Sequence, residues 1–127
     1  MKYIVAGGRD FTNGVIAHQV LDTFTDIDTI ISGDARGADF LGAMYATEKG
    51  IPLQHFPAYW DQYGKAAGYI RNAEMAEHGD ALIAFWDGKS KGTMNMIKAM
   101  RLHKKPYWVY DYTGKLIENV IGYKPYV

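Results

Sequence analysis

The sequence predicts an α/β fold, a Rossmann-like three-layer sandwich with a mostly parallel five-stranded sheet. Short apolar runs rich in Val, Ile and Tyr alternate along the chain with longer segments whose apolar residues recur at helical spacing. The connections between successive runs can form right-handed crossovers, which place helices on both faces of a parallel sheet. We expect the strands at residues 2–6, 28–32, 52–56, 81–85 and 107–110.

Four helices are expected to connect these strands, at residues 14–24, 37–49, 68–78 and 92–104. The last helix ends before Pro106, because a proline disfavours helical backbone in the residue that precedes it. In the tail that follows the last strand, Thr113-Gly114 favours a turn that would add a hairpin to the edge of the sheet.

Length and composition indicate one domain, residues 1–127, with 48% hydrophobic residues. Lys+Arg and Asp+Glu are equal at 14 each, so no overall basic field attracts nucleic acid, and small ligands are the expected partners. Cysteine is absent, which excludes disulfides and thiolate chemistry. The apolar start of the chain is too short for a signal peptide, and no run reaches membrane-spanning length. We expect a cytoplasmic protein without a membrane partner.

Polar loops follow three of the predicted strands, at residues 7–11, 32–39 and 85–93. In an open parallel sheet, ligands bind beyond the carboxyl ends of the strands, where neighbouring crossovers leave on opposite faces. Loops that are far apart in sequence should therefore converge on one rim and form one pocket.

The loop at residues 85–93 carries the strongest signal. A buried strand breaks there into Gly, Ser, Lys and Thr and then becomes an amphipathic helix, which presents free backbone N–H groups at a positive helix terminus. The spacing is not that of a Walker motif, so an ATPase is not supported. The residues expected to form this phosphate cup are Asp87, Ser90, Lys91, Gly92 and Thr93.

The first loop contributes Gly7, Gly8 and Arg9. The two glycines fit either a tight turn or a close approach of backbone to a ligand, and both interpretations stay open. Arg9 is well placed to bind an anion bidentately, the alternative being a surface ion pair with Asp10.

The second loop fits a backbone cradle combined with a guanidinium group. The alternative is a simple turn in which an acidic residue favours the start of the next helix. Its candidate ligand-binding residues are Ser32, Gly33, Arg36, Gly37 and Asp39.

Residues 57–75 form an unusually long connection with several aromatic side chains. These aromatics suit a flap that stacks on a base or ribose, or equally a small satellite core under the loop. The candidate ligand-binding residues here are Trp60, Lys65, Arg71 and Asn72. Arg71 and Glu74 are also candidate catalytic residues, since Arg71 could stabilise a developing anion and Glu74, like Asp61, could face the pocket or solvent.

No metal or cofactor is expected, because the spacing of the four histidines does not build a metal site. Met94, Met96 and Met100 are expected to lie in the core face of their helix.

Five spaced motifs occur in one order along the chain: G-R-D-F at 8–11, S-G-x-A-R-G-A-D at 32–39, F-P-A-x-W at 56–60, G-K-A-A-G-x-I-R-N-x-x-M at 64–75 and S-K-G-T at 90–93. Residues 3 to about 110 thereby closely resemble the YspA-like, cpYpsA-related branch of the SLOG superfamily. The resemblance implies a Rossmann-like fold and a nucleotide or nucleotide-derived ligand. Some members of this branch are carried by phages.

The same superfamily contains the Lonely-Guy phosphoribohydrolases, which cleave the N-glycosidic bond of nucleoside monophosphates. Arg71 resembles the Arg of their Arg-Lys pair, and Gly92-Thr93 resembles the G-T of their P-G-G-x-G-T-x-x-E motif. However, Asn72 replaces the Lys, and Met96 stands where the catalytic Glu would be. Hydrolysis would need a substitute carboxylate, for which Asp39, Asp87 and Glu74 are candidates.

Three functions are therefore weighed: binding of a nucleotide or its derivative, N-glycosidic hydrolysis of a nucleotide, and single-stranded DNA binding of the kind suggested by a resemblance to DprA. Binding is favoured, because the catalytic Glu is missing and the net charge is zero. A homo-oligomer is also expected, because SLOG relatives commonly pair and the tail is rich in aromatic residues. These are Tyr107, Trp108, Tyr110, Tyr112, Tyr123 and Tyr126.

Overall fold

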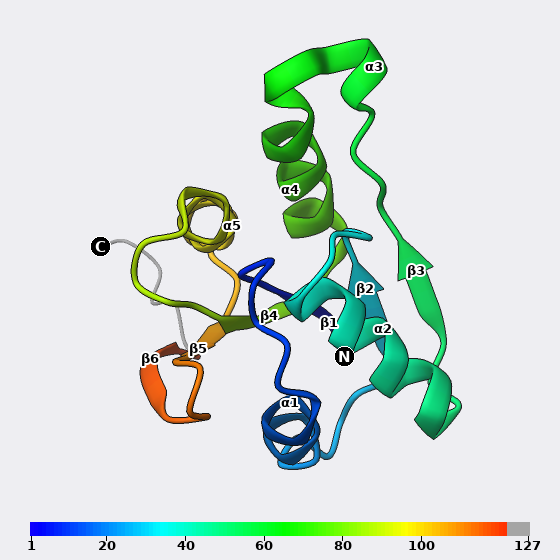
Figure 1. Ribbon diagram of the computed structural model, residues 1–127, viewed down its shortest axis with the longest axis vertical. Coiled ribbons are helices and arrows are strands. Elements are labelled where there is room, and N and C mark those ends of the chain that lie inside the picture. The colour runs from blue at the N-terminus through cyan, green and yellow to red at the C-terminus, as the bar shows by residue number, and fades with distance from the viewer. Residues whose placement is uncertain (122–127) are drawn as a thin grey trace.

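A six-stranded sheet forms the middle layer of the protein in the computed structural model, which describes residues 1–121 (Figure 1). The strand order is β3-β2-β1-β4-β5-β6. The strands are β1 (Lys2–Gly7), β2 (Thr29–Ser32), β3 (Leu53–His55), β4 (Ala81–Phe85), β5 (Tyr107–Tyr110) and β6 (Leu116–Val120). The predicted α/β fold class is confirmed, and the five expected strands form within one or two residues of their predicted bounds.

The predicted number of strands is wrong by one, because the tail hairpin adds β6 to the sheet. The carboxylate of Asp111 accepts hydrogen bonds from the backbone of Thr113 and Lys115, and Gly114 adopts a positive φ of 86°. This tight turn folds the chain back so that β6 pairs antiparallel with β5. All other pairings in the sheet are parallel.

Four helices cover the two faces of the sheet (Figure 1). On one face α1 (Gly14–Leu21) and α2 (Ala38–Lys49) bury an apolar cluster against β1, β2 and β4, and on the other α4 (Ala67–His78) and α5 (Lys91–Leu102) bury a second. Successive residues of β1 alternate between the two clusters, as the pleat of a strand requires. The first helix ends at Leu21, before the predicted residue 24, and the Phe24 ring instead packs edge-on against Tyr3 at 5.2 Å.

The long connection between β3 and α4 contains short helices that were not expected. These are α3 (Trp60–Tyr63) and the 3₁₀ turn η1 (Gly64–Ala66), which lie beyond the layers of the core (Figure 1). Tyr59, Trp60 and Tyr63 remain 55%, 49% and 43% exposed, so they do not form a satellite core. The satellite-core interpretation is therefore wrong, and stacking of these rings on a ligand stays a prediction.

The tail aromatics contribute less surface than expected. Tyr107 and Tyr110 are buried in the core, and Trp108 and Tyr112 are partly buried against it. Tyr123 and Tyr126 lie outside the described residues. Within residues 1–121, none of the helices has the length and apolar character needed to cross a membrane.

Candidate functional site

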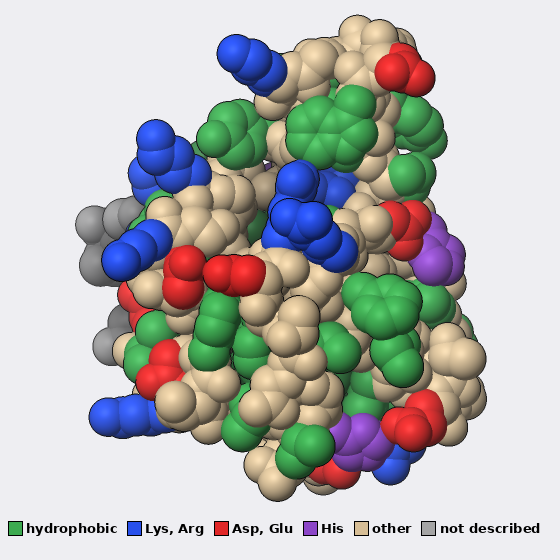
Figure 2. Space-filling model, viewed as in Figure 1, with side chains coloured by type: hydrophobic (Ala, Val, Ile, Leu, Met, Phe, Trp, Pro, Cys, Tyr) green, Lys and Arg blue, Asp and Glu red, His purple; other side chains and the backbone are tan. Residues whose placement is uncertain are grey.

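A cavity of about 570 Å³ opens at the carboxyl ends of β1 and β4. These two strands are neighbours, but the crossover after β1 leads to α1 on one face and the crossover after β4 leads to α5 on the other. The cavity therefore lies at the switch point of the sheet, where ligands of doubly wound folds bind. Lys and Arg side chains gather on this face of the molecule (Figure 2).

One wall of the cavity is the N-terminus of α5. The Ser90 hydroxyl caps the helix by accepting from the backbone N–H of Thr93 at 3.3 Å and from its hydroxyl at 3.1 Å. The carboxylate of Asp87 accepts from the backbone of Ser90 at 2.8 Å, which holds the preceding turn and lowers the pKa of Asp87. The N–H groups of the first helical turn, which have no intrahelical acceptors, are thereby held at the cavity.

The two glycines at the end of β1 pack closely against neighbouring residues and also line the cavity. A Cβ on Gly7 would lie 2.2 Å from the backbone oxygen of Phe85, and one on Gly8 would lie 1.8 Å from the Tyr112 hydroxyl. A Cβ on Gly37, whose φ is 78°, would likewise clash with the backbone oxygen of Gly8, but Gly37 does not line the cavity. Close packing therefore accounts for glycine at positions 7 and 37, and Gly7 and Gly8 also contribute surface to the cavity.

A buried carboxylate and a partly buried guanidinium face each other at the opposite wall. Asp39, only 4% exposed, accepts from the backbone N–H of Ala35 at 3.4 Å, and Arg71 donates through Nη1 to the backbone oxygen of Gly33. Burial raises the pKa of Asp39 to about 6, against the opposing attraction of Arg71. Burial likewise lowers the pKa of Arg71, which Asp39 partly restores. A Cβ on Gly33 would lie 2.6 Å from Arg71 Nη1, so this glycine leaves room for the pair.

Ser32 is fully buried and does not line this cavity, so it does not form the anticipated cradle. Its hydroxyl donates to the backbone oxygen of Asp39 and accepts from the backbone N–H of Asp34, each at 3.2 Å. These bonds hold the loop that carries Asp39.

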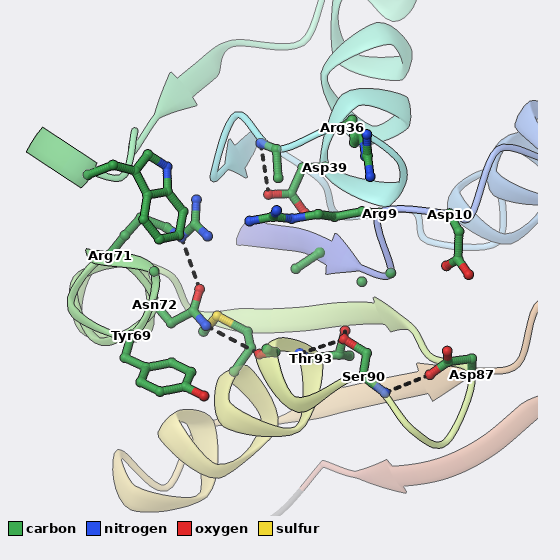
Figure 3. A pocket seen from close by; sticks show the side chains of 18 of the residues that line it. Arg9, Asp10, Arg36, Asp39, Tyr69, Arg71, Asn72, Asp87, Ser90 and Thr93 are labelled. Carbon is green, nitrogen blue, oxygen red and sulfur yellow. Dashed lines mark hydrogen bonds between the residues drawn. The ribbon is translucent and has the colours of Figure 1, made fainter. Parts of the chain in front are cut away.

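Two further arginines and an aromatic ring complete this side. The guanidinium carbon of Arg9 lies 5.9 Å from the centre of the Trp60 ring, a cation–π contact that joins the first loop to α3. Figure 3 shows Arg9, Arg36 and Asp39 on one side of the cavity and Ser90 and Thr93 on the other. Lys65 from η1 also lines the cavity.

Asn72 ties the two helices that flank the cavity. Its side-chain nitrogen donates to the backbone oxygen of Gly92 at 3.3 Å and to Asn95 Oδ1 at 3.0 Å, and its oxygen accepts from Arg71 Nε at 3.0 Å (Figure 3). The α5 wall and the Arg71 wall are therefore linked through one buried amide.

The structure brings most of the predicted ligand-binding residues together around one cavity. Those that do not line the main cavity are Ser32, Gly33, Gly37 and Lys91. Glu74 is exposed and does not line the cavity, because it lies about one helical turn beyond Arg71 on α4, and Asp61 is exposed on α3.

Several residues that line the cavity were not predicted from the sequence. They are Ala6, Asp10, Ala35, Gly68 and Tyr69, to which the structure adds Met96 from the core face of α5. Ala6, Asp10 and Ala35 are direct sequence neighbours of the predicted residues Gly7, Arg9 and Arg36, and this proximity was the available signal. Within residues 1–121, there is no group of three or more His, Cys, Asp or Glu residues that could hold a metal ion.

The fold and the cavity define a class of protein: a doubly wound α/β protein with a cationic cavity at its switch point. The family model of the YspA, cpYpsA-related SLOG family matches residues 1–63, which supports the YspA-like SLOG assignment. The chain is also similar to the gene 61 protein of Mycobacterium phage D29, with 37% identity over 76 residues. That match covers 54% of this chain and 60% of the phage protein's length.

Proposed function

We propose that this protein binds a nucleotide or nucleotide-derived ligand in the cavity between β1 and β4. The observation that carries the proposal is the meeting of a capped helix N-terminus with Arg9, Arg36 and Arg71 around one cavity at the switch point. Family membership is consistent with this proposal, since SLOG proteins are associated with nucleotide-related ligands.

The cavity offers separate surfaces to the two halves of such a ligand. Backbone N–H groups at the start of α5 suit a phosphate, and the arginines add charge-assisted donors. The half-exposed rings of Trp60 and Tyr69 offer flat surfaces for a base. A volume of about 570 Å³ is within the range of small-molecule sites.

The experiment is isothermal titration of the protein with mononucleotides and their derivatives, comparing two variants at one position. No described atom lies within 4 Å of a Cβ built on Gly92, so both Gly92→Asp and Gly92→Asn fit the first turn of α5. The aspartate adds a negative charge where the phosphate is expected, whereas asparagine has nearly the same shape without the charge.

We expect Gly92→Asp to weaken binding at least about tenfold, equivalent to about 1.4 kcal/mol, and Gly92→Asn to weaken it much less. Absence of binding by any nucleotide would refute the proposal. Equal affinities for the two variants would show that the phosphate does not sit at α5.

Hydrolysis of the bound nucleotide is a second candidate, favoured by one observation. Asp39 is a buried carboxyl group beside the cavity with a pKa raised to about 6, in the range useful for proton transfer near neutral pH. Against it, Met96 places a thioether in the cavity where the related hydrolases carry their Glu. The test is release of free base from a bound nucleotide, with Asp39→Asn as the inactive control; no release at any pH from 5 to 8 would leave binding alone.

A further inference from the structure

A second cavity of about 420 Å³ adjoins the first. The two have five lining residues in common: Arg9, Ala35, Arg36, Trp60 and Arg71. Gly33, Asp34, Pro57 and Ala58 line the second cavity and not the first. The shared residues include all three arginines of the site, so the strongest positive charge lies at the junction of two spaces rather than at the end of one.

The protein balances the positive charges at this junction only in part. Arg9 and Arg71 are close enough that the charge of Arg9 contributes to lowering the pKa of Arg71. The carboxylates of Asp39 and Asp34 oppose the charge of Arg71, while Arg9 contacts the Trp60 ring and Arg36 is exposed. An anionic group at the junction would relieve this repulsion and would accept hydrogen bonds from more than one guanidinium.

The second cavity differs in chemistry from the first. It is lined by the carboxylate of Asp34, which contacts His55 Nδ1 at 2.5 Å, and by the small side chains of Pro57 and Ala58. Asp34 has a left-handed backbone conformation, with a φ of 60°. A carboxylate beside small apolar surfaces and an indole ring suits a polyhydroxylated group, whose hydroxyls donate to the carboxylate and whose C–H face packs on the ring.

We propose that the two cavities together bind a nucleoside diphosphate linked to a sugar. The nucleoside and its first phosphate occupy the larger cavity with that phosphate at α5, the second phosphate lies among Arg9, Arg36 and Arg71, and the sugar occupies the smaller cavity beside Asp34. This inference rests on the proposed function and names the ligand class of the same site.

The test is titration of the protein with matched series in which one group is added at a time: AMP, ADP and ADP-ribose; UMP, UDP and UDP-glucose; GMP, GDP and GDP-mannose. We expect affinity to rise by about tenfold from monophosphate to diphosphate and again by about three- to tenfold when the sugar is added, for the base that the protein prefers.

Two variants separate the smaller cavity from the rest of the site. Ala58 is only partly buried and does not line the larger cavity, so Ala58→Phe fills the smaller cavity, and Ala58→Ser is its matched control. We expect Ala58→Phe to abolish the gain from the sugar and to leave monophosphate affinity within about twofold, and Ala58→Ser to retain the gain. Asp34→Asn should also reduce the gain from the sugar, but it removes a negative charge near Arg71, so its effect is measured as the ratio of sugar-conjugate to diphosphate affinity.

The outcomes distinguish this inference from the function on which it rests. If monophosphates bind but the sugar adds no affinity, or if Ala58→Phe weakens monophosphate and sugar conjugate equally, the two-cavity ligand is refuted while nucleotide binding stands. If no member of any series binds, the proposed function itself has failed, and the inference fails with it.

Discussion

Replacing Asp39 with asparagine should change how the stability of the protein depends on pH. Asp39 is 4% exposed, and burial raises the pKa of its carboxyl group from 3.8 to about 6. The amide of asparagine resembles the protonated carboxyl in shape and carries no charge at any pH. The variant therefore isolates the free-energy cost of ionising Asp39 inside the folded protein.

The magnitude follows from the two pKa values. Between pH 3.8 and 6 the folded state holds the proton of Asp39 more tightly than the unfolded state does, so the contribution of this group to stability falls as pH rises through that window. Since one pKa unit corresponds to about 1.36 kcal/mol, the complete loss above pH 6 is roughly 3 kcal/mol, of which about 2 kcal/mol falls between pH 4.5 and 7.

The assay is urea denaturation of wild type and Asp39→Asn at several pH values from 4.5 to 7.5. We expect the stability of the variant relative to wild type to rise by about 2 kcal/mol across this range. Asp61→Asn, a change of the same kind at an exposed position on α3, serves as control. A difference between Asp39→Asn and wild type that stays constant with pH, or that falls as pH rises, would refute the reasoning. A fall would mean that Arg71 stabilises the carboxylate by more than burial penalises it.

Three further predictions concern the framework of the cavity. Ser90→Ala removes the cap of α5 and should lower the free energy of unfolding by about 1 kcal/mol in urea denaturation. Ser90→Asp should retain the cap and weaken only anion binding. Equal stability of wild type and Ser90→Ala would contradict the capping role of Ser90. Gly7→Ala places a Cβ 2.2 Å from a backbone oxygen of β4 and should lower the free energy of unfolding by about 3 kcal/mol. Gly92→Ala, the control, should change the free energy of unfolding by no more than about 1 kcal/mol in either direction. Similar melting temperatures for the two variants would contradict the close packing of Gly7. Asn72→Leu removes both hydrogen bonds from α4 to α5 and should destabilise the folded protein by about 1–3 kcal/mol while also weakening ligand binding. An unchanged urea midpoint would show that the link through the Asn72 amide is dispensable.

Local pattern was sufficient to predict the layers of this fold. β4, Ala81–Phe85, is apolar at every position and buried at every position, as a central parallel strand must be, and its predicted bounds are those observed. The short helix α3 was missed because a four-residue helix contains too few turns to show a periodic pattern. The sixth strand was expected only as part of a hairpin, since Leu116–Val120 forms a strand because β5 offers it an edge to pair with.

The candidate site likewise contains residues that local pattern predicted and residues whose placement depends on tertiary contacts. Ser90, Gly92 and Thr93 were identified from sequence because a helix N-terminus is a local feature with local signals, and Arg9 and Arg36 because they follow strands whose carboxyl ends share one edge. Ser32 was assigned to the cavity incorrectly, because the direction of a loop side chain depends on its tertiary hydrogen bonds, here to the backbone of Asp39 and Asp34.

The sequence by itself determined the alternation of strands and helices along the chain, the absence of cysteine chemistry and the loops that carry positive charge. These features follow from residue type and spacing along the chain. Only the tertiary structure decided that Asp39 is buried beside Arg71, that Asn72 links two helices, and that a second cavity meets the first at three arginines. Burial, desolvation and shared cavity walls arise between residues far apart in sequence, so they exist only once the sheet and its helices have packed.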